Sequence, residues 1–313
     1  MSIIFSPLAS LRQIRLTPSR EDGIPQDLED DLRTYGAQLI QEAGRLAKLP
    51  QVAMATAQIL FQRFWYVSSM KQFGIRDIGM GALYLATKLE ECPMRLRDLV
   101  NVYDLLHQRS NYLLEHSSSS SSTTFPKFTY LPMAYSSSRF YDLKNAMVIS
   151  EMQVLKRLGF NVQVQLPYGT LVSYCQMLGL VGNQEKGIVE NAWGLLNDSL
   201  QTSLPALFSP STLAASTIFL SVHQIGHPLP DRWWELFDVD QKDMVVVCGT
   251  ILKLYERLDE RTGARAWRMS EKTEQSLGVA RINLSLSSKD IRATGKPSSP
   301  EPLNFYVHAY AYT

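Results

Sequence analysis

Apolar and polar positions along most of this chain follow the period of an α-helix. Between residues 28 and 49 the apolar side chains recur at intervals of three and four, as they do on one face of a helix. Similar patterns predict further helices over residues 51–68, 77–92, 95–114 and 139–158. Gly159 follows the last of these and is typical of a helix C-cap. We therefore expect five helices in the first half of the chain.

The second half repeats this plan. Helical patterns cover residues 167–178, 183–200, 233–237 and 241–258, and another helix starts at Ser209-Pro210-Ser211. Each half has one helix rich in small, uncharged residues, which is typical of a central helix packed on several sides by other helices. The sequence thus predicts an all-α fold of two successive five-helix groups, a duplication of fold rather than of sequence.

The helix over residues 77–92 changes character at its end. Its first part is uncharged, and it then presents Lys88, Glu90 and Glu91 before Pro93 ends it. A buried helix that carries a cation and two carboxylates to its own end suggests that these charges meet a partner.

Three segments lack such periodicity. We predict an irregular lead-in over residues 1–26, a mobile serine-rich loop over 116–138 and a poorly ordered tail over 263–313. The domains are then expected at 27–163 and 164–262.

Composition excludes several classes of function. The net charge of +1 provides no broad basic field for nucleic acid or an anionic membrane. Three dispersed cysteines suit neither a disulfide framework nor a zinc site, and indicate a reducing compartment. We expect no signal peptide, and no apolar run reaches the roughly 18 residues of a membrane span.

Candidate chemical motifs are weak. Gly79-Met80-Gly81 begins a Gly-x-Gly pattern, but no predicted strand precedes it and tight helix packing explains it better. The five histidines show no metal-ligand spacing. We therefore expect no catalytic residue, cofactor or metal.

Several segments resemble the cyclin family. Residues 86–93 (Ala-Thr-Lys-Leu-Glu-Glu-Cys-Pro) resemble the end of the third helix of a cyclin box, and residues 151–160 resemble the fifth-helix segment in which a glutamate precedes Leu-Gly-Phe. Further segments are similar to cyclin L in particular, namely residues 16–19, 49–56, 61–64, 97–102 and 197–200. The resemblance as a whole extends over about residues 16–261.

The resemblance implies two tandem cyclin boxes and a regulatory subunit rather than an enzyme. Its implied partner is a transcription-associated cyclin-dependent kinase of the PITSLRE type, with other transcriptional kinases as alternatives. It also implies a nuclear location and roles in RNA polymerase II transcription and pre-mRNA splicing. The chain departs from cyclin L at residues 305–310, where it has no arginine/serine-rich tail. Residues 32–36 also differ from the substrate-docking Met-Arg-Ala-Ile-Leu patch of cell-cycle cyclins.

The resemblance also implies a kinase-binding site. Lys88 and Glu151 would hydrogen-bond to the kinase backbone beside its αC helix, and Leu89, Leu155 and Phe160 would supply the apolar contact. The alternative is that Lys88 and Glu151 pair only with each other or with solvent.

Two other classes of function stay open. A TFIIB-like general transcription factor shares the double five-helix fold and binds DNA, but would be expected to have a basic stripe and a zinc ribbon. A scaffold would keep the fold and activate no kinase.

Overall fold

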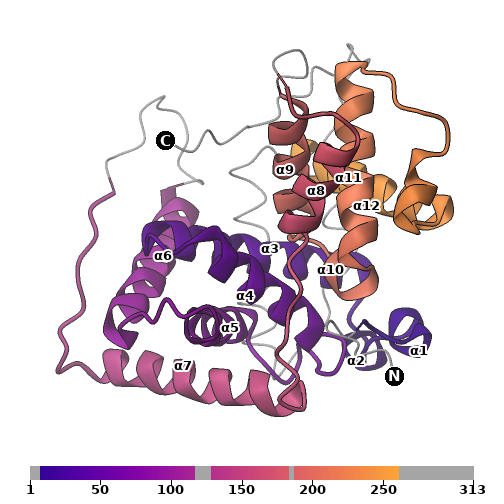
Figure 1. Cartoon of the computed structure of the whole chain (residues 1–313). Coiled ribbons are helices and arrows are strands. Elements are labelled where there is room, and N and C mark those ends of the chain that lie inside the picture. The colour runs from indigo at the N-terminus through magenta and orange to yellow at the C-terminus, as the bar shows by residue number, and fades with distance from the viewer. Residues whose placement is uncertain (1–7, 117–127, 183–186, 261–313) are drawn as a thin grey trace.

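A computed structural model describes residues 8–116, 128–182 and 187–260, and their regular secondary structure is entirely helical (Figure 1). This confirms the predicted all-α class. The helices are α1 (Leu11–Arg15), α2 (Pro18–Glu21), α3 (Gln26–Leu46), α4 (Gln51–Phe64), α5 (Ile75–Leu89), α6 (Leu96–His116), α7 (Ser138–Arg157), α8 (Tyr168–Met177), α9 (Ile188–Ser199), α10 (Leu204–Leu207), α11 (Pro210–Ile225), the 3₁₀ helix η1 (Trp233–Phe237) and α12 (Gln241–Glu260).

Two apolar cores organise these helices. In the first, α5 contacts α3, α4, α6 and α7; in the second, α11 contacts α8, α9, α10, η1 and α12. Figure 1 shows the two groups one above the other. Ala55 and Ile59 of α4 belong to the second core, so α4 also joins the groups. The predicted central, small-residue helices are thus confirmed as α5 and α11.

Glycines allow the closest helix contacts of the first group. A Cβ atom on Gly81 of α5 would lie 2.6 Å from both the Glu151 backbone nitrogen and the Ser150 carbonyl carbon of α7. Because backbone cannot move aside as a side chain can, the crossing of α5 and α7 requires glycine there. This crossing fixes the position of Glu151 relative to the end of α5.

The prediction of an irregular lead-in is wrong for residues 8–26. Ser10 caps α1 in a capping box with Gln13, and Thr17 caps α2, whose Pro18 occupies the first turn. Threonine and proline are common in turns, and here Thr17 and Pro18 use the same chemistry to start a short helix.

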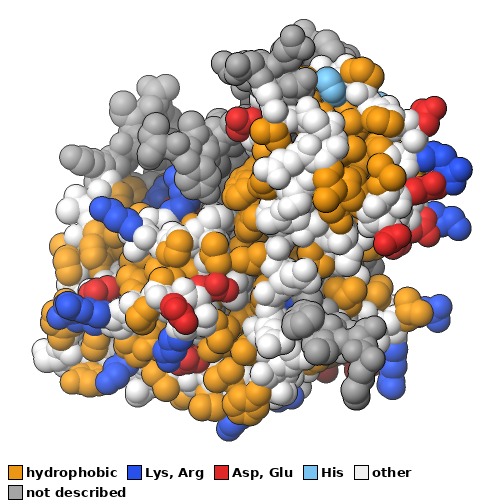
Figure 2. All heavy atoms as spheres, in the orientation of Figure 1, with side chains coloured by type: hydrophobic (Ala, Val, Ile, Leu, Met, Phe, Trp, Pro, Cys, Tyr) orange, Lys and Arg blue, Asp and Glu red, His pale blue; other side chains and the backbone are white. Residues whose placement is uncertain are grey.

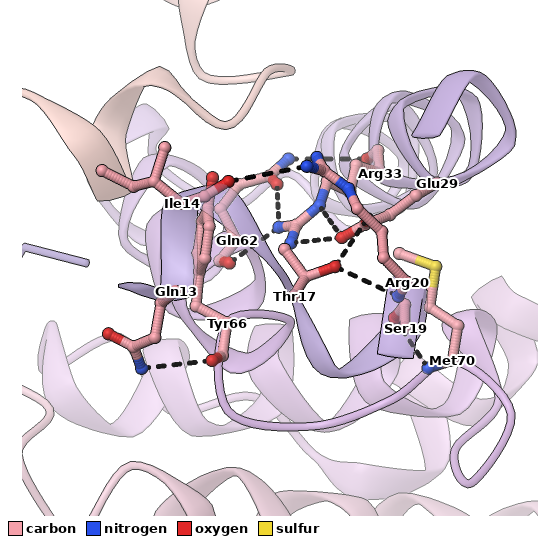
Figure 3. A network of polar contacts seen from close by, with 10 residues as sticks. All are labelled: Gln13, Ile14, Thr17, Ser19, Arg20, Glu29, Arg33, Gln62, Tyr66 and Met70. Atoms are coloured by element: carbon pink, nitrogen blue, oxygen red, sulfur yellow. Dashed lines mark hydrogen bonds and ion pairs between the residues drawn. The ribbon is translucent and has the colours of Figure 1, made fainter. Parts of the chain in front are cut away.

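A buried ionic network holds this N-terminal segment against α3 and α4 (Figure 3). The Glu29 carboxylate, fully buried, accepts hydrogen bonds from Thr17 Oγ1 at 2.8 Å and Arg20 Nε at 2.9 Å. Its other oxygen accepts from Arg33 Nη2 at 2.8 Å, and Arg33 Nη1 donates to the Gln62 carbonyl at 3.0 Å. Every charged group of this network therefore has a partner of opposite sign, as burial requires.

Other predicted elements agree in type and differ at their ends. The helix predicted over residues 51–68 ends at Phe64, where the chain turns through i→i+3 bonds such as Tyr66 N to Arg63 O. The single-turn helix α10 was missed because Pro205 gives its sequence the character of a loop. The tail over 263–313 and residues 117–127 of the serine-rich loop lie outside the described residues.

Candidate protein-binding site

The end of α5 and the middle of α7 bring Lys88 and Glu151 together. Lys88 Nζ lies 2.6 Å from Glu151 Oε1, and the ammonium also sits 4.1 Å from the centre of the Tyr84 ring. Lys88 is in the last turn of α5, where the helix dipole favours a cation. The pair depends on the Gly81 crossing, because Gly81 contacts the Glu151 backbone about two helical turns before Lys88 on α5.

This ion pair does not use all the hydrogen-bonding capacity of its two groups. The Lys88 side chain is 45% exposed, and an ammonium has three N–H donors, of which Glu151 takes one. A carboxylate likewise has lone pairs on two oxygens. The Lys88 ammonium therefore keeps two N–H donors for a partner, whereas Glu151, whose side chain is 13% exposed, has its second carboxylate oxygen left to accept.

The end of α7 places Phe160 at the surface. Phe160 N donates to Leu155 O at 2.8 Å and Gly159 N donates to Lys156 O at 3.1 Å, the two bonds of a Schellman motif. This confirms the predicted cap at Gly159. Both Gly159 and Phe160 have φ of 60°, and the Phe160 side chain is 65% exposed. A bulky aromatic held in the left-handed region and in solvent is an unusual feature.

The predicted apolar residues differ in exposure. Leu89 is 38% exposed, whereas Leu155 is partly buried and packs on the first core. Leu155 therefore contacts the first core and is also partly exposed at the surface.

Sequence reasoning missed an exposed apolar stripe on α7. Val148, Ile149 and Met152 are 45%, 59% and 44% exposed. Val148, Met152 and Leu155 follow one another at intervals of four and three on one helix face, and Ile149 adjoins Met152 three residues away. The sequence pattern does indicate this stripe, because α7 has apolar residues on more faces than the first core can bury. We call the following set the docking face: Leu89, Val148, Ile149, Met152, Leu155 and Phe160, with Lys88 and Glu151 at its rim. Hydrophobic side chains are prominent along the lower edge of Figure 2, where α7 lies.

A cleft of about 540 Å³ adjoins this face. Leu89 and Glu90 form one wall, and the extended residues 162–165 form the other. Glu90 is held in place because its Oε1 accepts a hydrogen bond from Thr56 Oγ1 at 2.6 Å.

Residues 32–36, which correspond to the substrate-docking patch of cell-cycle cyclins, are mostly buried. Leu32, Arg33, Tyr35 and Gly36 are buried, and Arg33 is engaged in the Glu29 network. Among the described residues, no three His, Cys, Asp or Glu side chains are grouped as metal ligands would be. Within the same residues, no helix has both the length and the apolar character needed to cross a bilayer.

The sequence is similar to a family model and to curated proteins. The family described as "Cyclin, N-terminal domain" matches residues 8–163. Cyclin-L2 of Homo sapiens is 38% identical over 247 residues, which cover 78% of this chain and 44% of that protein. Cyclin-L1 of Homo sapiens is 35% identical over 284 residues, covering 90% of this chain and 50% of that protein. The chain thus spans about half the length of these curated relatives.

Solved structures share the fold at low sequence identity. A chain of the yeast RNA Pol II CTD kinase CTDK-1 complex matches with a TM-score of 0.59 and 15% identity, covering 80% of this chain and 73% of that one. A chain of the yeast TFIIK (Kin28/Ccl1/Tfb3) complex matches with a TM-score of 0.54 and 16% identity, covering 80% and 96%. These likenesses concern the fold alone.

Proposed function

Because this chain belongs to the cyclin family and is similar to cyclin L, we propose that it is the regulatory subunit of a transcription-associated cyclin-dependent kinase. Its two helical groups, residues 27–163 and 164–262, would be tandem five-helix cyclin boxes. The first candidate partner is a kinase of the PITSLRE type. A nuclear location, action on RNA polymerase II transcription and a link to pre-mRNA splicing belong to the same proposal.

The docking face is the observation that carries this proposal. It combines exposed apolar side chains on a rigid helix with a charged rim at Lys88 and Glu151. An apolar centre with a polar rim is typical of protein–protein interfaces. A partner helix laid against α7 would cover Ile149 and Met152 and meet the Lys88 ammonium at its edge.

Such docking supplies a mechanism of activation. A protein kinase is active only when its αC helix is placed so that the Lys–Glu ion pair of its own active site forms. A cyclin that holds αC against a rigid surface selects that arrangement, since it binds the active conformation more tightly than the inactive one. The cyclin itself then needs no catalytic residue.

A charge exchange tests the role of the rim. The single variants Lys88→Glu and Glu151→Lys would be compared with the double variant that carries both changes, in a kinase assay with an RNA polymerase II C-terminal-repeat peptide. The double variant retains an ion pair between α5 and α7 but reverses the charges offered to a partner. Circular dichroism would confirm that all three variants fold.

The outcomes separate the two interpretations of the pair. If Lys88 and Glu151 bind kinase backbone, kinase activation falls in all three variants, because the donor and the acceptor have exchanged places. If the pair serves only to join α5 and α7, the double variant regains activation. No activation by the folded wild type with any transcriptional kinase would overturn the proposal and leave the scaffold alternative.

A further inference from the structure

Basic and aromatic side chains gather where α6 and α7 begin. The N-terminal ends of these helices lie at the same corner of the first group (Figure 1). We call the following five residues the tyrosine–arginine platform: Arg97 of α6, Tyr135 in the segment before α7, and Arg139, Tyr141 and Lys144 of α7. None of them contributes to the docking face as defined above.

The platform forms an ordered array of cations and rings. Arg97 Cζ lies 5.2 Å from the centre of the Tyr135 ring, and Lys144 Nζ lies 6.0 Å from that of Tyr141. Phe140 joins the two tyrosines edge to face, at 5.4 Å from Tyr135 and 5.9 Å from Tyr141. Tyr135 and Tyr141 are nevertheless 50% and 52% exposed. Tyrosine and arginine exposed together in this way are typical of interface hot spots.

The charges of the platform favour an acidic partner of moderate charge density. Arg139 pairs with the fully buried carboxylate of Asp104 at 2.7 Å, and because its side chain is 50% exposed its other guanidinium N–H groups can still donate to a partner. Asp98 offsets Arg97 at 3.4 Å, and Asp142 is also exposed on α7. Because Asp98 and Asp142 alternate with the cations, the platform has no unbroken positive stretch of the kind that a continuous phosphate backbone requires. Spaced carboxylates of a peptide can instead approach Arg97, Arg139 and Lys144 one at a time.

The platform continues the docking face along α7. Tyr141 precedes Val148 by seven residues and Met152 by eleven, intervals that return to the same side of a helix. A kinase that contacts Val148 and Met152 could therefore also contact Tyr141 on the same side of α7. Contiguity of this kind indicates one extended interface rather than two unrelated surfaces.

We propose that the tyrosine–arginine platform binds an acidic segment of the same kinase, outside its αC helix. This inference rests on the proposed kinase-binding function. The carboxylates of the segment pair with Arg97, Arg139 and Lys144, while Tyr135 and Tyr141 cover its side chains. The contact adds affinity and selects among kinases by charge.

The test is a titration of kinase binding by the full chain and by the double variant Arg97→Glu/Lys144→Glu. Arg139 is left unchanged, since its removal would leave the buried carboxylate of Asp104 without its cation. Lys242→Glu/Lys253→Glu, at two exposed lysines of α12, is the control matched in net charge. We expect about tenfold weaker binding for the double variant at low salt, with a shallower salt dependence, and little change for the control. Activation at saturating cyclin is retained, because the αC contact is intact.

When wild type binds the kinase, two results would overturn the inference. One is an unchanged affinity of the double variant for the kinase, with the same salt dependence as wild type. The other is binding of a single-stranded oligouridine that both substitutions abolish while kinase affinity stays constant, which would assign the platform to nucleic acid. If wild type binds no kinase, the proposed function fails. Binding of a labelled glutamate-rich peptide to the wild type and to the double variant then tests separately whether the platform binds acidic segments. Peptide binding that the double variant loses supports the platform, and its absence in wild type overturns it.

Discussion

At the scale of single residues, one glycine determines whether the site forms. Gly81 allows the backbones of α5 and α7 to touch, and Lys88 meets Glu151 only because of that contact. Gly79, on the same helix, has more room: its Cβ would meet Ile40 Cγ1 at 3.5 Å, an ordinary van der Waals distance. The two glycines therefore have different functions.

Gly81→Ala is expected to lower the free energy of unfolding by about 2 kcal/mol, because the added methyl forces the two helices apart. Kinase activation would fall as well, since Glu151 moves with α7. Gly79→Ala is the matched control, and should be neutral or slightly stabilising. Urea denaturation of both variants measures the difference. Equal losses in both would contradict the role given to the α5–α7 crossing.

The buried thiols predict a response to alkaline pH. Burial raises the pKa of Cys175 to about 11 and that of Cys248 to about 12, whereas an unfolded thiol titrates near 9. The folded state thus binds more protons between pH 9 and about 11 for Cys175, and between pH 9 and about 12 for Cys248. Within these windows the stability falls as pH rises, by about 1.4 kcal/mol per pH unit for each thiol. Replacing Cys175 with alanine should flatten the stability–pH curve above about pH 9. A curve parallel to that of wild type would show that Cys175 does not cause the loss.

At the scale of elements, α7 has two apolar sides with different functions. Its inner side supplies Met147 and Val154 to the first core, both fully buried, while its outer side presents the docking face. A helix needs only the inner stripe to be stable in this fold. The outer stripe is a liability in solution unless a partner covers it.

Ile149→Asp should therefore separate binding from stability. Ile149 is 59% exposed, so the free energy of unfolding should change by less than about 0.5 kcal/mol. Kinase binding should weaken about tenfold or more, because a carboxylate would be buried in the apolar centre of the interface. Val245→Asp on α12, where the side chain is 61% exposed, is the control. Calorimetric titration and thermal unfolding of both variants measure the two effects. Equal affinity for both variants would place the interface elsewhere.

At the scale of the whole molecule, polar contacts join the two helical groups and the N-terminal segment. Arg257 of α12 lies 3.4 Å from Asp27 and 3.6 Å from Asp30 of α3, and Gln62 Nε2 donates to Gln201 O at 3.3 Å. Ala9 N donates to Ala206 O at 2.8 Å, so the N-terminal segment also touches α10. The three parts therefore support one another.

Glu29→Ala tests this support. It removes the carboxylate on which Thr17, Arg20 and Arg33 converge and leaves the Arg33 guanidinium, only 2% exposed, without its anion. Such a change typically costs about 3–5 kcal/mol. Residues 8–24 should also become more sensitive to protease, because two of the bonds that hold them are lost. Glu21→Ala, at an exposed acid in α2, should cost little. A loss no larger for Glu29→Ala than for Glu21→Ala would contradict the function of the network.

The sequence by itself predicted most of the helices and, through the cyclin resemblance, five residues of the candidate site. It did not show that Val148, Ile149 and Met152 are exposed beside them. Apolar spacing is a property of the local chain, so the helices around Gly81 and Glu151 and the cap at Gly159 could be predicted from it. Only the tertiary structure decided what these elements meet. It showed that Lys88 pairs with Glu151, that Ile149 and Met152 face solvent, and that Thr17 begins a helix. The physical reason is that a periodic pattern shows which residues are apolar, whereas burial depends on neighbours far away in the chain.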